Sequence, residues 1–311
     1  MILNIVFLIV GMALVLWGAD RFTDGASAVA RRWHVSELVI GLTVVSMGTS
    51  LPEFIVSFFS TLRGSSDMSA GNILGSNIFN TLFIVGASAM MMRLPVSGTL
   101  LKRDIPICLV VSLLLLGLCL DGNLSRLEGF ILCVVFCLYL AYTYYIGVHE
   151  RGALDMQEDK TPVWKILLLL IVGIGCLVGG GQLMVNNAVE LARMWGVSES
   201  VIGLTILAAG TSLPELATSV VAAKKGSDGL ALGNVVGSNI FNIAFVLGIC
   251  SAVRSMEINE ISITDWCAFI GSVVLLWLTA STGKKLSKWE GAFLMIAYLC
   301  YLGLLITSPS L

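Results

Sequence analysis

The sequence predicts an all-α membrane protein in which ten transmembrane helices form two inverted five-helix repeats, with helices 2 and 7 broken. Three observations predict this fold. The 311-residue chain is 57% hydrophobic and only 12% charged, whereas about 25% of the residues in a soluble domain are charged. Its apolar runs are long enough to cross a bilayer, and its first half is repeated in its second half.

The apolar runs define the individual helices. A membrane-spanning helix needs about 20 predominantly apolar residues. Ten runs with almost no charge meet this requirement, near residues 2–19, 38–62, 68–92, 104–120, 127–147, 163–189, 197–223, 229–253, 264–283 and 289–309.

The repeat gives the order of the helices. Residues 41–80 align without a gap with residues 203–242, at an offset of 162, and 20 of the 40 positions are identical. We therefore expect an N-terminal five-helix copy over 1–147, a cytoplasmic linker over 148–162 and a C-terminal five-helix copy over 163–311. Because five is an odd number, the second copy must enter the bilayer from the opposite side, as in the inverted repeats of many secondary transporters.

The loop charges predict the orientation. The loops after the odd-numbered helices contain 14 of the 18 Lys and Arg residues. Positively charged loops stay in the cytoplasm. We therefore expect a protein integral to the plasma or inner membrane of a prokaryote, with both termini outside the cytoplasm. No long basic run suggests a nucleic-acid partner.

Each copy contains the motif GTSLPE, at residues 48–53 and 210–215. Proline removes a backbone donor and clashes with the preceding turn, so Pro52 and Pro214 should break helices 2 and 7. Irregular backbone at that depth is tolerated inside protein or beside a watery cavity. The break exposes carbonyl oxygens, which suit a small hard cation.

The acidic residue of this motif, Glu53 or Glu215, has two interpretations. Ser-Leu-Pro-Glu also fits a helix capping box, in which the Glu side chain merely bonds the backbone. However, an ionisable residue at the centre of a membrane helix costs roughly 3 kcal/mol and is usually functional. We favour the functional interpretation, which the capping geometry does not exclude.

A second repeated motif places polar residues on helices 3 and 8. Their four-residue spacing puts the members of each set on one helix face, and the sets are Asn72, Ser76 and Asn80, and Asn234, Ser238 and Asn242. Small residues such as Gly71 and Gly75 permit close helix approach, so packing with interhelical hydrogen bonds is the alternative. Because the pattern occurs in both copies, we expect a polar lining that faces the two Glu residues.

The four segments together offer carboxylate, hydroxyl, amide and backbone oxygens. Such donors select calcium, sodium, magnesium or manganese over zinc or copper. Two carboxylates neutralise one divalent ion, and competition between that ion and sodium is what an exchanger requires. We expect no cofactor, with calcium and sodium ions as the transported ligands.

With both motifs present in both copies, the sequence resembles the cation/calcium exchanger superfamily, and among its members the prokaryotic sodium/calcium exchangers. The resemblance implies alternating access, with helices 1 and 6 sliding against an eight-helix core, and a central cation site bounded by Glu53 and Glu215. The other ligands that it implies are the side chains or carbonyls of Thr49, Ser50, Thr211 and Ser212, the side chains of Ser76, Ser238, Asn80 and Asn242, and the carbonyls of Ser46 and Ala208.

The sequence departs from some members of the superfamily, which carry Asp where this chain has Asn80 or Asn242. The missing carboxylate leaves the stoichiometry and any potassium dependence open, and proton coupling through the two Glu residues is a further alternative. A cation channel is a competing class. An intramembrane enzyme is disfavoured, since the sequence shows no nucleophile–base pair or HExxH motif.

Overall fold

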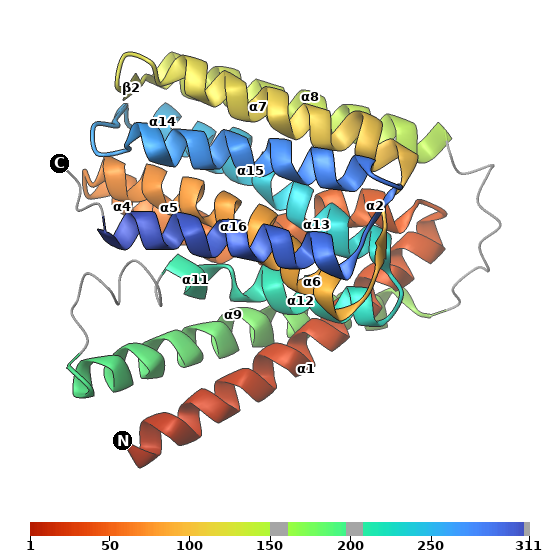
Figure 1. Ribbon diagram of the computed structural model, residues 1–311. Coiled ribbons are helices and arrows are strands. Elements are labelled where there is room, and N and C mark those ends of the chain that lie inside the picture. Colours follow the sequence, from red (N-terminus) through yellow and green to blue (C-terminus); the bar gives the residue numbers. More distant parts are fainter. Residues whose placement is uncertain (150–160, 197–207, 308–311) are drawn as a thin grey trace.

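The computed structural model describes residues 1–149, 161–196 and 208–307. These residues form a bundle of helices with two very short two-stranded sheets at its ends (Figure 1). In the N-terminal copy the elements are α1 (Ile2–Trp33), α2 (Glu37–Ile40), the π-helix η1 (Gly41–Val45), α3 (Ser46–Thr49), α4 (Leu51–Leu62), α5 (Ser66–Ile78), the π-helix η2 (Phe79–Ile84), α6 (Val85–Met91), β1 (Leu94–Pro95), the π-helix η3 (Leu100–Asp104), α7 (Ile105–Leu118), β2 (Asn123–Leu124) and α8 (Arg126–His149).

The C-terminal copy has corresponding elements, many of them displaced by the 162 residues of the sequence repeat. They are α9 (Val163–Met194), α11 (Ala208–Thr211), α12 (Leu213–Lys224), α13 (Asp228–Ile240), the π-helix η6 (Phe241–Leu247), α14 (Gly248–Val253), β3 (Met256–Glu257), α15 (Ile263–Ser281), β4 (Lys285–Leu286) and α16 (Lys288–Thr307).

Membrane-spanning helices dominate the described part of the chain. Seven of its helices are long and apolar enough to cross a membrane, and the bent pair Glu37–Thr49 and Leu51–Leu62 would make an eighth span. The run predicted near 104–120 corresponds to α7 with η3 in front of it. The run predicted near 197–223 lies partly outside the described residues.

Two continuous helical rods occupy the centre of the bundle. They run over Ser66–Met91 and Asp228–Val253, and 78% and 83% of the residues in their most apolar windows are buried. For α1 and α9 the corresponding shares are only 22% and 28%. The repeated Asn and Ser residues therefore lie on the most enclosed helices, whereas α1 and α9 lie at the periphery.

Helices α1 and α9 pack against each other as a pair along one side of the bundle (Figure 1). A Cβ atom at Gly11 would lie 2.8 Å from the carbonyl oxygen of Gly180, and one at Gly18 would lie 2.8 Å from that of Gly173. Small residues allow such close backbone contact between membrane helices. The glycines therefore determine where the two long helices cross.

The short strands connect the two copies reciprocally. β1 pairs with β4, and β2 pairs with β3, both antiparallel. Adding 162 to the residue numbers of β1 gives those of β3, and the same shift converts β2 into β4. The shift thus exchanges one sheet for the other, as expected if the copies are related by a two-fold axis.

The π-helical segments were not predicted. η2 begins at Phe79, one residue before Asn80, and η6 begins at Phe241, one residue before Asn242. These Asn residues are the last members of the two polar sets, which we call the polar stripes. A π-segment inserts extra backbone into a helical turn and often occurs at functional sites. The side chains that follow Asn80 and Asn242 therefore point in other directions than in a continuous α-helix.

Candidate cation-binding site

Both GTSLPE motifs break their helices. α3 ends at Thr49 and α4 begins at Leu51, with a bend of 48° between the two spans. In the C-terminal copy, α11 ends at Thr211 and α12 begins at Leu213. The residues at the breaks, Ser50 and Ser212, have nearly identical backbone angles (φ −83° and −89°, ψ 11° in both). The predicted break is thus confirmed in both motifs.

The capping interpretation of these motifs is wrong. Neither Ser50 nor Ser212 makes a side-chain cap to its own helix. Each hydroxyl instead donates to the Glu of the other copy. Ser50 Oγ lies 2.7 Å from Glu215 Oε1, and Ser212 Oγ lies 2.8 Å from Glu53 Oε1. The two breaks therefore face each other, and each Glu side chain is held by the opposite copy.

The two Glu side chains are fully buried, with 0% of their surface exposed. In each, the second carboxylate oxygen, Oε2, has no hydrogen-bond partner. Within the described residues no Lys, Arg or His forms an ion pair with either Glu. Buried carboxylates are costly unless they are paired or bind a cation. The arrangement therefore favours either a cation or a bound proton at the two carboxylates.

Two Asn side chains form hydrogen bonds to the helices that follow the breaks. Asn72 Nδ2 donates to Glu53 O at 3.4 Å and to Ser57 Oγ at 3.0 Å. Asn234 makes the same two contacts in the C-terminal copy, to Glu215 O at 3.4 Å and to Ser219 Oγ at 2.9 Å. These Asn residues thus position the Glu backbone. Ser57 and Ser219, their partners, were not predicted from the sequence.

The remaining stripe residues supply oxygens without partners. Ser76 Oγ, Asn80 Oδ1 and Asn242 Oδ1 are buried and make no hydrogen bond. Ser238 Oγ donates to the carbonyl oxygen of Ser46 at 3.4 Å, and that carbonyl also accepts from the Ser50 amide. Because buried polar groups are normally hydrogen-bonded, these free oxygens are candidate ligands.

The two Thr residues before the breaks differ. Thr49 Oγ1 has two acceptors within reach of its one hydrogen, Val45 O at 3.1 Å and Asn234 Oδ1 at 3.0 Å, whereas Thr211 Oγ1 is buried and has no hydrogen bond. Ala208 is the first residue of α11 and borders the segment that the structure does not describe. The carbonyl ligand expected from Ala208 therefore remains a prediction.

All of the unpartnered atoms just named are oxygens, which suits a hard cation. Among the described residues no cluster of three or more His, Cys, Asp or Glu side chains is placed to hold a metal ion. An ion at this position would be held by two carboxylates and by neutral oxygens. Few charged ligands joined by neutral oxygens suit an ion that must also be released, as ion conduction and transport require.

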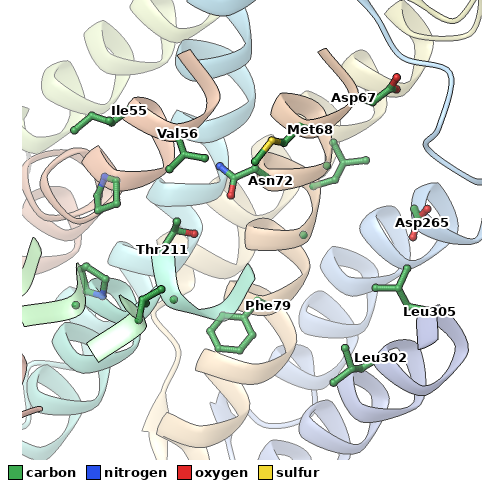
Figure 2. Close-up of a pocket in the computed structure, with 18 of the residues that line it drawn as sticks. Ile55, Val56, Asp67, Met68, Asn72, Phe79, Thr211, Asp265, Leu302 and Leu305 are labelled. Atoms are coloured by element: carbon green, nitrogen blue, oxygen red, sulfur yellow. The ribbon is translucent and has the colours of Figure 1, made fainter. Parts of the chain in front are cut away.

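A cavity of about 690 Å³ leads toward this site. Pro52 and Pro214, from the two breaks, line it together with Asn72 and Thr211. Figure 2 shows Asn72 and Thr211 at the cavity, with Asp67 farther along it. Residues of both helix breaks therefore line this cavity, whereas the two Glu side chains are fully buried and do not line it.

Comparisons with known proteins agree with this arrangement. The sodium/calcium exchanger protein family matches residues 3–145 and 165–307. The putative antiporter CaxA of Alkalimonas amylolytica is 38% identical over 99% of this chain and 100% of its own length. The inner membrane protein YrbG of Escherichia coli (strain K12) is 34% identical over 98% of this chain and 97% of its own length.

A solved structure shows the same fold. The sodium-calcium exchanger NCX_Mj, soaked with 2.5 mM Na⁺ and 0.1 mM Ca²⁺, matches with a TM-score of 0.86 at 32% identity, over 98% of this chain and 99% of that chain. The family and its structural neighbours are membrane transporters and not enzymes. The chain is therefore an integral membrane protein of the cation/calcium exchanger type, and it belongs to the sodium/calcium exchanger family.

Proposed function

We propose that this protein is a secondary active antiporter that exchanges sodium for calcium by alternating access, with Glu53 and Glu215 at the centre of the cation site. One observation carries the proposal. Ser50 and Ser212 hold the two Glu side chains reciprocally, and one oxygen of each carboxylate stays buried without a partner. One carboxylate oxygen from each copy is therefore available as a cation ligand.

The charge of this pair explains why two kinds of ion would take turns. Two buried carboxylates repel each other strongly at low dielectric, so the empty, doubly ionised site is unfavourable. One calcium ion neutralises both charges, and sodium ions can do so in its place. Since both occupants use the same carboxylates, binding of one excludes the other, and the protein moves them in opposite directions.

The architecture supports alternating access. The reciprocal pairing of β1 with β4 and of β2 with β3 is expected from ten helices arranged as inverted repeats over 1–147 and 163–311, joined by the linker 148–162. In this arrangement the site lies between the repeats near the bilayer midplane, and both termini lie outside the cytoplasm. The peripheral pair α1 and α9 would move against the other helices.

The ligand set in this proposal is the one expected from the sequence. The carboxylates of Glu53 and Glu215 are joined by oxygens of Thr49, Ser50, Thr211, Ser212, Ser76, Ser238, Asn80, Asn242, Ser46 and Ala208. Proton or potassium coupling is the alternative within the superfamily, because amides at 80 and 242 replace a carboxylate of some members. Calcium and sodium ions are the proposed substrates, and the lipid bilayer is the surrounding solvent.

Replacing each carboxylate with the isosteric amide tests the proposal. Glu53→Gln and Glu215→Gln keep an oxygen that accepts the Ser hydroxyl, so the fold should persist, but each removes a charge. Calcium transport in proteoliposomes should fall by on the order of 100-fold in either variant. Glu257→Gln, at an exposed Glu in β3, is the matched control. Near-normal transport by either site variant would contradict the role of that Glu.

A further inference from the structure

Two further buried Asn residues directly follow Ser76 and Ser238 in the sequence, and the proposed ligand set does not include them. Asn77 on α5 and Asn239 on α13 are 1% and 2% exposed. They occupy the same position in the two sequence copies, and each contacts an Asn ligand of the other copy. Their hydrogen bonds determine which end of each ligand amide is free.

The first chain of hydrogen bonds begins at a backbone carbonyl. Asn77 Nδ2 donates to the carbonyl oxygen of Asn239 at 3.2 Å. A carbonyl oxygen only accepts, so turning the Asn77 amide over would place two acceptors against each other. Asn77 Oδ1 therefore accepts, and Asn242 Nδ2 donates to it at 3.0 Å. This bond occupies the nitrogen of Asn242, and its Oδ1 remains without a partner.

The second chain reaches the same result through a hydroxyl group. Thr81 Oγ1 donates its only hydrogen to the carbonyl oxygen of Asn77 at 2.8 Å. Toward Asn239 it therefore accepts, and Asn239 Nδ2 donates to it at 2.6 Å. Asn239 Oδ1 then accepts from Asn80 Nδ2 at 3.3 Å. Again the amide nitrogen is occupied, and Asn80 Oδ1 stays buried and unpartnered.

Given the cation site of the proposed function, we propose that Asn77, Asn239 and Thr81 are positioning residues that orient the amides of Asn80 and Asn242 with their oxygens toward the cation. Without them either amide can turn over, which would present an NH₂ donor to a positive charge. The Asn77 chain is directed by the Asn239 carbonyl itself, which can only accept. The Asn239 chain is directed by the Thr81 hydroxyl, which donates to the Asn77 carbonyl.

The same chains explain why amides are suited to positions 80 and 242. A carboxylate at 242 would face Asn77 Oδ1, an acceptor at 3.0 Å from the present Nδ2. Asn77 cannot turn over to donate without losing its bond to the Asn239 carbonyl. Asn77 and Asn239 thus favour a side chain with a donor end at positions 242 and 80, which an amide offers and a carboxylate does not. With Asn at both positions, Glu53 and Glu215 supply the charge of the proposed site.

Thr81→Val gives a mild test, because the matching position in the C-terminal copy is Ile243, a buried aliphatic residue. The purified protein is titrated with Na⁺ alone and with Ca²⁺ alone, and the cation-dependent rise in Tm gives a half-saturating concentration. We expect Thr81→Val to raise the half-saturating Na⁺ concentration by about three- to ten-fold, the effect of losing one oriented hydrogen bond. Thr218→Val is the control, since Thr218 Oγ1 is buried, has no hydrogen bond, and corresponds to Val56.

A double-mutant cycle separates positioning from a general loss of packing. Thr81→Val is combined with Asn80→Ala, and Asn77→Leu with Asn242→Ala. If the positioning residues act through the Asn amides, they should add no further loss once that amide is gone. Additive losses, or a Thr81→Val variant that binds Na⁺ like Thr218→Val, would overturn the inference. Should Asn77→Leu not fold, the Thr81 cycle decides alone.

This binding measurement also separates the inference from the proposed function. A wild-type protein that binds Na⁺ and Ca²⁺ in the titration but exchanges neither would contradict the antiport and leave the amide orientation supported by the cycle. A wild-type protein with no cation-dependent change in Tm would overturn the site and, with it, the inference.

Discussion

The two copies of the repeat can be compared at two places, the central carboxylates and the helix ends. At the centre they are nearly interchangeable, because Ser50 holds Glu215 just as Ser212 holds Glu53, with distances of 2.7 and 2.8 Å. At the helix ends they differ. Lys225 Nζ lies 2.6 Å from both Asp20 Oδ1 and Asp24 Oδ1, which joins α1 to the end of α12.

The counterpart of this ion pair is absent from the other end. A shift of 162 residues relates Asp20 to Gln182, Asp24 to Asn186 and Lys225 to Arg63. Gln182 donates to Asn186 within α9 at 2.8 Å, and Arg63 has no ion pair among the described residues. With the topology proposed above, the joined end is cytoplasmic. The reciprocal Ser–Glu hydrogen bonds are thus the same in the two copies, whereas the ion pairs between α1 and Lys225 have no counterpart among the described residues of the other copy.

One close backbone contact in the C-terminal copy has a counterpart that lies outside the described residues. A Cβ at Gly237 on α13 would lie 2.6 Å from the carbonyl oxygen of Leu42. The shift of 162 residues relates Gly237 to Gly75 and Leu42 to Leu204, and residue 204 is not among the described residues. The close approach expected at Gly75 therefore stays a prediction.

The largest effect should come from breaking the symmetric centre. Ser50→Ala and Ser212→Ala each remove one hydroxyl donor from a buried carboxylate, which costs about 1.5–3 kcal/mol for a hydrogen bond to a charged group. We expect each variant to lower calcium transport at subsaturating calcium by about 10- to 100-fold, measured in proteoliposomes. The two losses should be similar. Ser255→Ala, at an exposed serine, is the control, and a loss confined to one copy would contradict the symmetry.

The close contact at Gly237 predicts a loss of stability. Gly237→Ala forces a methyl group against the Leu42 backbone and should reduce the free energy of unfolding by about 1–3 kcal/mol. Gly117→Ala, at an exposed glycine of α7 with no described atom within 4 Å of such a Cβ, is the control and should cost less than half as much. Thermal unfolding in detergent measures both. An equal loss in Gly117→Ala would show that the contact with Leu42 is not the cause.

The smallest effect should come from the unequal helix ends. The Lys225 pairs are partly exposed, at 30–41% of their side-chain surface, so together they contribute about 1 kcal/mol or less. Lys225→Gln should make the cytoplasm-open state more populated and lower the half-saturating calcium concentration at the cytoplasmic face by about two- to five-fold. Calcium uptake by inside-out vesicles measures this concentration.

Two exposed cations provide controls for that experiment. Lys224→Gln removes a neighbouring charge for which the structure gives no ion pair, and Arg63→Gln removes the counterpart charge in the N-terminal copy. Neither should change the half-saturating calcium concentration at the cytoplasmic face. A change in Arg63→Gln equal to that in Lys225→Gln would mean that net charge, and not the tie to Asp20 and Asp24, sets the balance.

Much of the candidate site could be predicted from local sequence. Pro52 and Pro214 act on the backbone within one turn, so the helix breaks follow from residue type alone. Because the motif is repeated, the same structure and role are predicted for both of its copies. A duplicated Glu in an apolar run is likewise a local signal, because its burial cost depends on the surrounding lipid and protein and not on a particular partner.

What the sequence could not provide depends on contacts between distant residues. Ser50 and Glu53 fit a capping box, and only the packing of the two copies shows that each Ser bonds the Glu of the other copy. The direction of the Asn77 amide follows from the Asn239 carbonyl, 162 residues away. The π-helices η2 and η6 have no residue signature that we recognise. Lys225 meets Asp20 across 205 residues, which no local pattern encodes.

Sodium and calcium are proposed to take turns at Glu53 and Glu215. Isotopic calcium uptake into proteoliposomes loaded with sodium is the decisive measurement. Uptake should follow the outward sodium gradient, cease when sodium is equal on both sides, and not be restored by a potassium or proton gradient. Calcium uptake that is equally fast without a sodium gradient would indicate a channel, and uptake driven by protons or potassium would show that sodium is not the coupling ion.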